Sequence, residues 1–523
     1  MARTAKSILL ATFLWALILT GIAAVVHYLV IPRFRAARQA QATGQNGSRD
    51  AAQATVRLAA DNFSGYCLLR SPELADRLAR RGVAWSVLDD AADYMGRLRA
   101  LQTGSVEMAV FPVNSLIQCG DRLGSFPAAI VYLIDETVGA DALIARKSRV
   151  ASLADLNTPE ARFVLTPDSP SEFLVRIVLA SFSLPAVPRD TWLLPARGSA
   201  DVCRLFRSES RALPHAYALW EPDVSRALAD PDAHILVDTS KLKGYVIDAL
   251  VVRREFIVEH EAVVRTVVEE YARTVYAARD RMAEAVARDI SAGGGTASPA
   301  EAEAVAKGIR WKNTLENYAH FGITGGTDGL DSLAAIVRKV TEVLVRTEAL
   351  NRDPLAGATE SITFDRVVRA LAKSGFHPGR ELNLLGDLPQ PGTDEPVRGA
   401  ETAVSLTEAQ WQALVTVGEM RVDPILFGRG NAAIGVQGEQ ALTALAETLA
   451  SWPHYYLSVT GRVRPGGEQA AALHLARTRA EAVVAILSAK GVAPQRLRTA
   501  AEIAPRDVPE AQAVVFVVSQ APY

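Results

Sequence analysis

The feature that most constrains this fold is an alternation of strand and helix patterns that begins at Thr55. Short apolar runs predict strands at 55–60, 83–88 and 106–113. Helical patterns lie between them at 71–81, capped by Ser71 with Pro72 in first position, and at 90–102, ended by Gly104. Such alternation predicts an α/β fold with a mostly parallel, doubly wound sheet.

The same pattern continues to the middle of the chain. Further strands are predicted at 128–134, 142–145, 163–165, 217–220 and from Val246, and a long apolar helix ending at Ser181 is predicted to start at Ser169 or Ser171. In open α/β sheets, ligands are held at the carboxyl ends of strands. Asn114 and Ser115 follow one predicted strand, and Trp220 and Glu221 end another, so we expect these side chains to face a cleft.

Composition excludes several classes of function. A chain of 523 residues with 49% hydrophobic and 22% charged residues is globular and long enough for two or three domains. A net charge of −2 argues against a nucleic-acid partner. The three cysteines make no disulfide framework and are expected to be buried thiols, with a Cys67–Cys119 disulfide across the cleft base as the alternative. No zinc spacing, nucleophile–base pair or paired acids are evident, so neither an enzyme nor a metal or other cofactor is predicted.

The amino terminus is predicted to be a membrane anchor. Residues 8–31 form an apolar run of about 24 residues without formal charge, which is long enough to span a bilayer. A cleaved signal peptide is the alternative, because small residues occur at 21–24. Arginines after the run favour an uncleaved anchor, which we assign to 1–35. The Ala/Gln/Gly-rich segment 36–54 is predicted to be a flexible spacer.

A set of local matches in order connects these pieces. They are at 101–111 (LQTGSVEMAVF), 140–144 (ADALI), 150–156 (VASLADL), 220–226 (WEPDVSR) and 248–256 (DALVVRREF). Together they resemble the periplasmic substrate-binding proteins of the nitrate, sulfonate, taurine and thiamine-precursor uptake group of ABC transporters. The resemblance covers about 55–350 and implies two α/β lobes, joined by crossover strands, that close on a small ligand.

The resemblance also implies a ligand site. The candidate residues are Asn62, Ser64 and Tyr66 of the first loop, Asn114, Ser115, Ser169, Ser171, Trp220, Glu221, Lys243 and Tyr245. Hydroxyls, an amide and helix N-termini suit an oxyanion or carboxylate, and an aromatic ring suits a flat or cationic group. Glu221 disfavours a plain anion unless it is paired. The expected ligand is therefore a small polar molecule, either an anion or an amine-bearing compound.

The carboxyl-terminal domain, 405–523, follows a Pro/Gly/acid-rich linker assigned to 351–404. Its pattern predicts strands at 424–430, 455–459 and 513–518 and helices at 438–451 and 469–487. With Leu475-Ala-Arg-Thr-Arg-Ala480 on the second helix, this domain resembles the small α+β peptidoglycan-binding domain of the OmpA-like family. The family pairs a helix arginine, here Arg479, with an acid that this chain replaces by Arg464.

That replacement changes the chemistry expected of the tail. The family's acid and arginine bind the diaminopimelate of the wall peptide, whereas two like charges at a protein surface repel by roughly 1–4 kcal/mol. Arg464 and Arg479 could therefore hold another anionic feature of peptidoglycan, or the domain could dock on an envelope protein complex.

The complete prediction is an inner-membrane, single-pass protein with most of its chain in the periplasm. It would bind a small polar ligand and couple that binding to the cell envelope. The alternatives are the substrate-binding subunit of an ABC importer and a non-catalytic envelope scaffold with a vestigial cleft.

Overall fold

The computed structural model describes residues 54–209, 212–324, 330–379, 405–428, 430–463, 468–503 and 514–523. The predicted anchor at 8–31, the spacer up to residue 53, residues 380–404 of the linker and Arg464 lie outside these ranges. Within them, no helix combines the length and the apolar character that crossing a bilayer requires.

The first lobe is built on a mixed sheet in the order β11-β4-β10-β3-β1-β2. Strands β1 and β3 run parallel, whereas β10 is antiparallel to β3 and β4. Strands β3 and β4 are buried along their whole length, as expected for sheet strands covered on both faces. The strands are β1 (Ala54–Ala60), β2 (Val83–Asp89), β3 (Met108–Pro112), β4 (Ala128–Thr137), β10 (Ile247–Arg253) and β11 (Ile309–Trp311).

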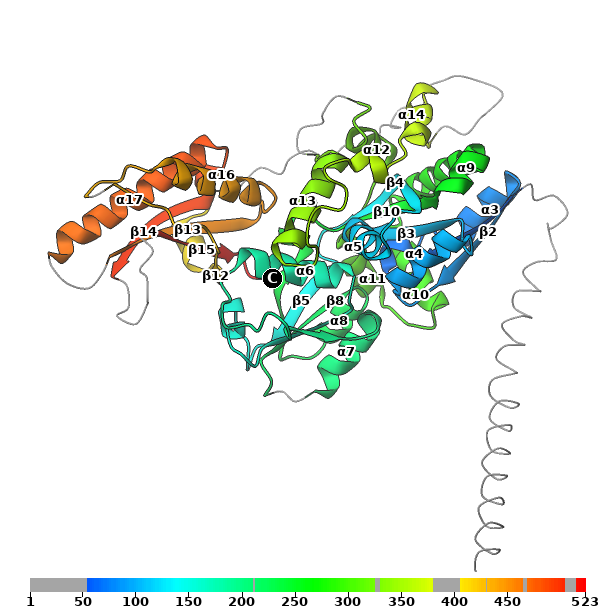
Figure 1. The fold of residues 1–523 in the computed structure, drawn as a ribbon. Coiled ribbons are helices and arrows are strands. Elements are labelled where there is room, and N and C mark those ends of the chain that lie inside the picture. The colour runs from blue at the N-terminus through cyan, green and yellow to red at the C-terminus, as the bar shows by residue number, and fades with distance from the viewer. Residues whose placement is uncertain are drawn as a thin grey trace, which may run out of the picture. The chain divides into compact units, whose positions relative to one another are not determined.

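Helices pack against this sheet (Figure 1). Helix α4 starts at Tyr94, later than predicted, because the Asp93 side chain accepts a hydrogen bond from Gly96 N and caps it. Two further helices follow β10, and the first of them begins at Arg254. The helices are α3 (Pro72–Arg80), α4 (Tyr94–Thr103), α5 (Val113–Leu123), α9 (Arg254–Ala278), α10 (Met282–Ala292), α11 (Pro299–Lys307), α12 (Thr314–His320), α13 (Leu333–Arg346) and α14 (Arg366–Lys373).

The second lobe contains a mixed sheet in the order β7-β6-β8-β5-β9. Its core is formed by Ile144, Val164, Phe206, Tyr217 and Leu219, all buried. The elements are β5 (Asp141–Arg146), β6 (Arg162–Leu165), α6 (Pro170–Ser181), β7 (Leu193–Pro195), α7 (Gly198–Ser208), β8 (His215–Trp220), α8 (Asp223–Leu228) and β9 (Ala233–Asp238).

The chain passes from one lobe to the other between β4 and β5 and returns between β9 and β10. Gly139 lies in the first passage with φ 130°, a conformation that L side chains rarely adopt. Val138 N and Ala140 N beside it both donate to Gly308 O. The predicted arrangement of α/β lobes joined by crossover strands is therefore present.

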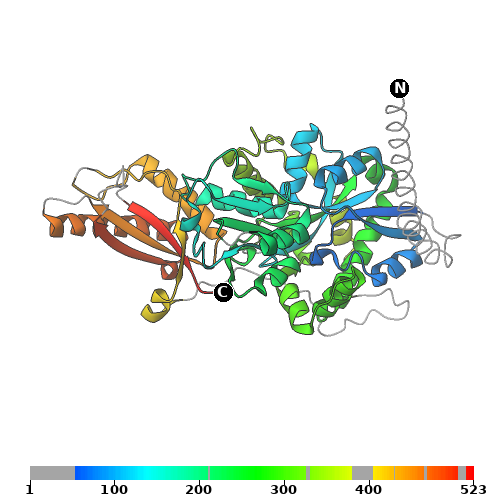
Figure 2. The same cartoon turned by 90° about the horizontal axis from the view of Figure 1, so that it is seen from below.

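The carboxyl-terminal domain has a separate sheet in the order β12-β15-β13-β14, with helices α16 and α17 packed together. Figure 2 shows the last strand, β15, in red within this sheet. The elements are α15 (Glu408–Gln412), β12 (Val415–Glu419), α16 (Val436–Ala450), β13 (Tyr455–Val463), α17 (Gln469–Ala489), β14 (Leu497–Ile503) and β15 (Val514–Gln520).

The strand predicted at 424–430 is wrong. Of that segment, the described residues form only an isolated bridge between Phe427 and Ile434, and Leu426 is 65% exposed. Pro424 lacks an N–H for a strand ladder, and Gly428 and Gly430 disfavour extended pairing. The edge strand beside β15 is β12 instead. Strand β14, at the other edge of the sheet, was not predicted from sequence either.

Gly461 on β13 is where helix α17 approaches its sheet most closely. A Cβ atom at this position would lie 2.1 Å from the backbone oxygen of Ala476. Only glycine permits this contact, which fixes the helix against the strand one turn before Arg479.

Candidate functional site

A small cavity lies between the lobes. Its volume is about 10 Å³, room for roughly one water molecule. The residues around it come from both lobes: Asp61, Phe63, Tyr66, Tyr94, Asp141, Pro170, Trp220 and Asp248. Several of them are polar groups that have been removed from solvent.

The sheets bring these residues together at strand ends. Asp61 directly follows β1, and Asp248 is the second residue of β10, opposite Asp135 on β4. In the other lobe, Asp141 begins β5 and pairs in register with Trp220, the last residue of β8. Strand ends from both lobes therefore form the cavity wall, as the general rule for α/β sheets predicts.

Larger grooves exist on the surface, and the charges of the largest of those described are matched. One of about 570 Å³ is lined by α9, α10, α11 and α12. Its charged side chains include the ion pairs Lys307–Glu303 at 3.0 Å and Arg279–Asp280 at 3.5 Å. The buried polar groups that lack partners at the inter-lobe cavity make that smaller space the better candidate site.

One acid at the cavity is neutralised. Arg97 is fully buried and its Nη2 lies 2.9 Å from Asp61 Oδ2. The same guanidinium binds Asp90 through two contacts of 2.6 Å. The Tyr94 hydroxyl also donates to Asp61, at 3.3 Å. The single positive charge of Arg97 is thus shared between the carboxylates of Asp61 and Asp90 and does not neutralise a third acid.

Asp135, Asp141 and Asp248 have no such partner. Each is at most 1% exposed, and burial raises the pKa of all three above the usual range. For Asp248 the pKa rises to about 7, because of burial and then the charge of Asp61. No donor among the described residues reaches Asp135 Oδ1 or Oδ2, Asp141 Oδ1 or Asp248 Oδ1 within hydrogen-bond geometry. The Asp248 carboxyl group interacts with the Tyr66 hydroxyl and with the carboxyl group of Asp135, with which it can share a proton.

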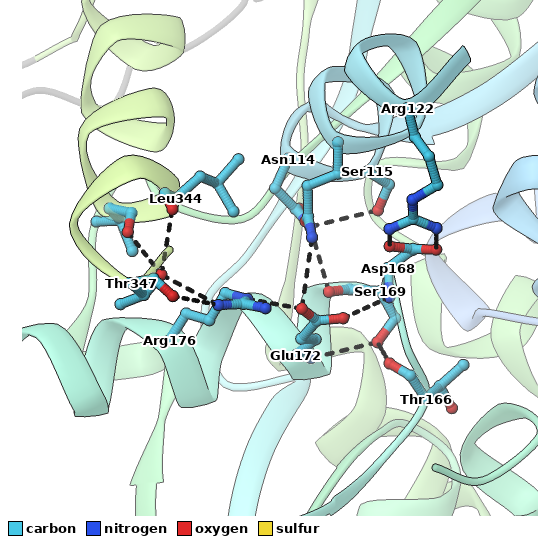
Figure 3. A network of polar contacts seen from close by, with 12 residues as sticks. Asn114, Ser115, Arg122, Thr166, Asp168, Ser169, Glu172, Arg176, Leu344 and Thr347 are labelled. Atoms are coloured by element: carbon cyan, nitrogen blue, oxygen red, sulfur yellow. Dashed lines mark hydrogen bonds and ion pairs between the residues drawn. The ribbon is translucent and has the colours of Figure 1, made fainter. Parts of the chain in front are cut away.

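A second set of contacts crosses between the lobes beside the cavity, and we call it the clasp (Figure 3). It is formed by Asn114, Gln118 and Arg122, which lie four residues apart and therefore on one face of α5. Their partners are the start of α6 and the residue before its cap. Asn114 donates to Ser169 O at 3.2 Å, Gln118 donates to Glu172 at 3.4 Å, and Arg122 binds Asp168 through contacts of 2.6 and 2.7 Å.

The α6 side of the clasp is held in place by its own bonds. Ser169 caps the helix by accepting from Glu172 N, while Glu172 accepts from Asp168 N at 2.6 Å and from Arg176 at 2.6 Å. Asp168 has φ 60°, a conformation that Asp tolerates better than most residues. The Arg122–Asp168 pair of the clasp thus joins opposite charges, while Asn114 and Gln118 contribute amide hydrogen bonds, and Asn114 Oδ1 has no partner among the described residues.

The structure places the sequence-predicted residues in different surroundings. Tyr66 and Trp220 line the cavity. Asn114 and Ser169 belong to the clasp, and Ser115 accepts from Asn114 at 3.3 Å. Ser64 and Ser171 are buried with no hydrogen-bond partner for either hydroxyl among the described residues. These are the predicted residues that the fold gathers near the inter-lobe space.

Other predicted residues point elsewhere. Asn62 is exposed, and its neighbours Asp61 and Phe63 line the cavity instead. Glu221 is turned toward α8, where its carboxylate accepts from Ser225 N at 3.0 Å and Ser225 Oγ at 2.7 Å. Lys243 and Tyr245 do not line the cavity, and the Tyr245 ring packs against Phe173.

The cavity acids were missed by reasoning from sequence. Asp135 was placed in a loop, yet β4 continues through it to Thr137. A usable signal existed, since Asp61, Asp141 and Asp248 each directly follow or begin an apolar strand run. Because Asp is rarely buried unless it is paired, an acid directly beside an apolar strand run is a candidate for a functional position.

In the small domain, Arg479 is engaged with its own loop. Its guanidinium donates to Asn431 O at 3.0 Å and Gly428 O at 3.3 Å, and lies 4.9 Å from the Phe427 ring centre. Arg464, the other predicted anion-binding residue, is outside the described residues. The three cysteines are buried free thiols. Among the described residues, no group of three or more His, Cys, Asp or Glu side chains could hold a metal ion.

Comparisons with known proteins support both parts of the fusion. Residues 426–512 match the OmpA family. The rest of the chain is similar to solved structures that include the alkanesulfonate-binding protein SsuA from Xanthomonas axonopodis pv. citri bound to MOPS. That likeness has 16% identity, covers 59% of this chain and 98% of that one, and has a TM-score of 0.45. The OmpA match confirms the resemblance inferred from sequence for the carboxyl-terminal domain.

Two further solved structures differ in function from each other. The periplasmic nitrate-binding protein NrtA from Synechocystis PCC 6803 is 12% identical, with 61% of this chain and 88% of that one covered and a TM-score of 0.47. The desulfurization enzyme DSZB is 13% identical, with 62% and 100% covered and a TM-score of 0.43. Likeness at this level says nothing about a ligand. No curated protein matches the chain.

Proposed function

We propose that this chain is a non-catalytic solute-binding protein of the cell envelope that closes its lobes over a small polar molecule. The observation that supports this most directly is the set of unpartnered buried polar atoms at the inter-lobe cavity, on Asp141, Trp220 and Asp248. Each unsatisfied buried group costs about 1–3 kcal/mol. Several around one cavity favour a bound molecule that supplies the missing hydrogen bonds.

The clasp supports binding by closure. It joins α5 of one lobe to the start of α6 of the other, beside a cavity of only about 10 Å³. A ligand larger than a water molecule enters once these contacts have broken and the lobes have separated. Re-forming the clasp then encloses the ligand, as in the hinge closure of two-lobed binding proteins.

The ends of the chain would hold this module in the envelope. The apolar run 8–31, followed by arginines, supports a single-pass anchor in the inner membrane with the bulk of the chain in the periplasm. The OmpA match at 426–512 supports a tail that docks on peptidoglycan or on an envelope protein complex. Ligand binding would thus be coupled to the envelope rather than released with a free-standing carrier.

The test uses the purified full-length chain in detergent. We expect at least one small polar compound from a panel of amino acids, sulfonates, nitrate and pyrimidines to raise Tm with concentration, as mass action requires. Trp220→Ala should abolish that shift, whereas Trp411→Ala, in the small domain, should retain it. A panel that leaves Tm unchanged would contradict solute binding.

The tail is tested with isolated sacculi. Full-length chain that sediments with sacculi would support a wall contact, and loss of sedimentation in Arg479→Ala would assign the contact to that side chain. A chain that remains in the supernatant leaves an envelope protein as the partner.

A second candidate is a scaffold with a vestigial cleft. The observation in its favour is that Tyr66, Pro170 and Trp220 reduce the inter-lobe space to room for about one water molecule. Under this candidate, Trp220→Ala lowers Tm by opening the core, and no small molecule raises Tm in either protein.

A further inference from the structure

The carboxyl groups around the cavity bear on the charge of its ligand. Asp61, Asp141 and Asp248 line the cavity, and Asp135 lies opposite Asp248 on the neighbouring strand. Only Asp61 has a cationic partner at hand, and that partner, Arg97, also binds Asp90. The wall therefore carries more acids than bases.

Charged groups on the surrounding elements do not correct this imbalance. Glu221, after β8, adds a further negative field at Asp141. Lys312, after β11, is fully buried and bound to Glu136 at 2.5 Å. Within the described parts of the chain, no ion pair reaches Asp135, Asp141 or Asp248. Buried carboxyl groups are either paired with a cation or held protonated, and a cation in the cavity would allow these groups to ionise.

An independent observation comes from the aromatic side of the cavity. Trp220 is 3% exposed and lines the cavity, and its indole N–H has no acceptor among the described residues. Tyr66, Tyr94 and Phe63 complete this wall, with Phe63 and Tyr66 in an edge-to-face arrangement at 5.2 Å. Aromatic faces attract cations, and an unpaired indole N–H requires a hydrogen-bond acceptor.

We infer that the cleft takes a small molecule with a protonated amine, placed between Asp61, Asp141 and Asp248, and a hydrogen-bond acceptor directed at Trp220. This inference rests on the proposed solute-binding function and names its ligand class. An ammonium group supplies three donors to carboxylate oxygens that otherwise lack them. An anion of the same size would instead meet several like charges at short range.

The experiment compares compounds of similar size and opposite charge. The full-length chain is titrated with ethanolamine, propylamine, glycine and putrescine, and separately with acetate, ethanesulfonate and nitrate, by thermal unfolding and calorimetry. We expect one or more amines to raise Tm and the anions to leave it unchanged. Asp141→Asn should weaken the binding of that amine by at least about tenfold, because it removes a charge-assisted hydrogen bond.

Asp76→Asn is the matched control. It removes the same charge from an exposed position on α3, far from the cavity lining, and should bind the amine like the parent chain. Asp141→Asn should itself fold, since it relieves repulsion, and its Tm without ligand should equal or exceed that of the parent.

The outcomes separate this inference from the function on which it rests. Binding of an anion that Trp220→Ala abolishes, with no amine effect, overturns the ammonium assignment and leaves solute binding intact. No effect of any compound overturns both. An amine effect that survives Asp141→Asn and Asp248→Asn unchanged also overturns the assignment, because the amine then binds elsewhere.

Discussion

The clasp and the cavity lie side by side between the same lobes, yet their electrostatics are opposite. In the clasp, Arg122 meets Asp168 and the amides of Asn114 and Gln118 meet oxygen acceptors. In the cavity, carboxyl groups face one another and the Trp220 N–H has no acceptor. One region stabilises lobe contact without help, and the other stabilises it only when a further molecule is present.

This difference suggests a division of roles. Contacts that are complete in the closed protein limit how far the lobes drift apart, but they contribute nothing to ligand choice. Groups that are incomplete lower stability and, for that reason, discriminate among ligands, since function and stability commonly conflict at binding sites. The variants below test whether this division holds.

The largest effect is expected from Arg97→Met. Removing the guanidinium leaves Asp61 and Asp90 without their shared cation, and breaking a buried ion pair from one side costs about 3–5 kcal/mol. The expected result is a large fall in the urea midpoint of the full-length chain.

Arg99→Met is the control for that variant, because Arg99 is exposed on the same helix. Its midpoint should stay within about 0.5 kcal/mol of the parent. If the two variants behave alike, Arg97 does not neutralise the cavity wall.

The next effect is a pH dependence carried by Asp248. The pKa of Asp248 is raised from 3.8 to about 7 in the folded chain. Its contribution to the free energy of unfolding is therefore fully present below pH 3.8 and is lost as the pH rises through 7. Over roughly 3 pH units this amounts to about 4 kcal/mol. Asp248→Asn should therefore match the parent in stability near pH 4 and exceed it near pH 8.

The comparison must be made between parent and variant, because other groups titrate in the same range. Burial lowers the pKa of His320 to about 4, so its contribution is lost as pH falls and opposes that of Asp248. This opposing trend is common to both proteins and cancels in the difference. A difference that does not change with pH would show that Asp248 is not under strain.

The smallest effect is expected in the clasp. The Arg122 side chain is 57% exposed and that of Asp168 only 12%, so solvent screens much of their attraction. A double-mutant cycle with Arg122→Ala and Asp168→Asn should give a coupling of about 0.5–1 kcal/mol in urea unfolding. Asn is chosen because it also tolerates the left-handed backbone at 168. Coupling near zero would remove the clasp from the closure mechanism.

Much of the binding domain could be predicted from sequence because its strands are continuous apolar runs and its helices carry strong caps. Ser169, for example, was proposed as a helix cap and does accept from Glu172 N. In the small domain, β14 was missed because residues such as Arg498 and Glu502 alternate with small side chains at a sheet edge, where burial leaves a weak pattern. The segment 424–430 looked more apolar than β12 or β14 and was wrongly predicted to be a strand of this sheet.

The site was predicted less completely than the fold. Trp220 and Tyr66 could be placed because each ends or follows a strand at the expected edge. The clasp role of Asn114 and the turn of Glu221 toward Ser225 depend on which partner lies closest in space, and local sequence does not contain that information. The cavity-lining acids Asp61, Asp141 and Asp248 escaped notice because they are distant in sequence from one another and become a cluster only after folding.

Gly461 has a consequence for how the carboxyl-terminal domain can evolve. Since its backbone touches Ala476, the spacing between strand β13 and helix α17 is set by main-chain atoms and not by the residues that give the family its chemistry. Side chains away from this contact can therefore change while the helix keeps its place. The domain can exchange one partner for another without being rebuilt, and a glycine with no chemistry of its own is what preserves that freedom.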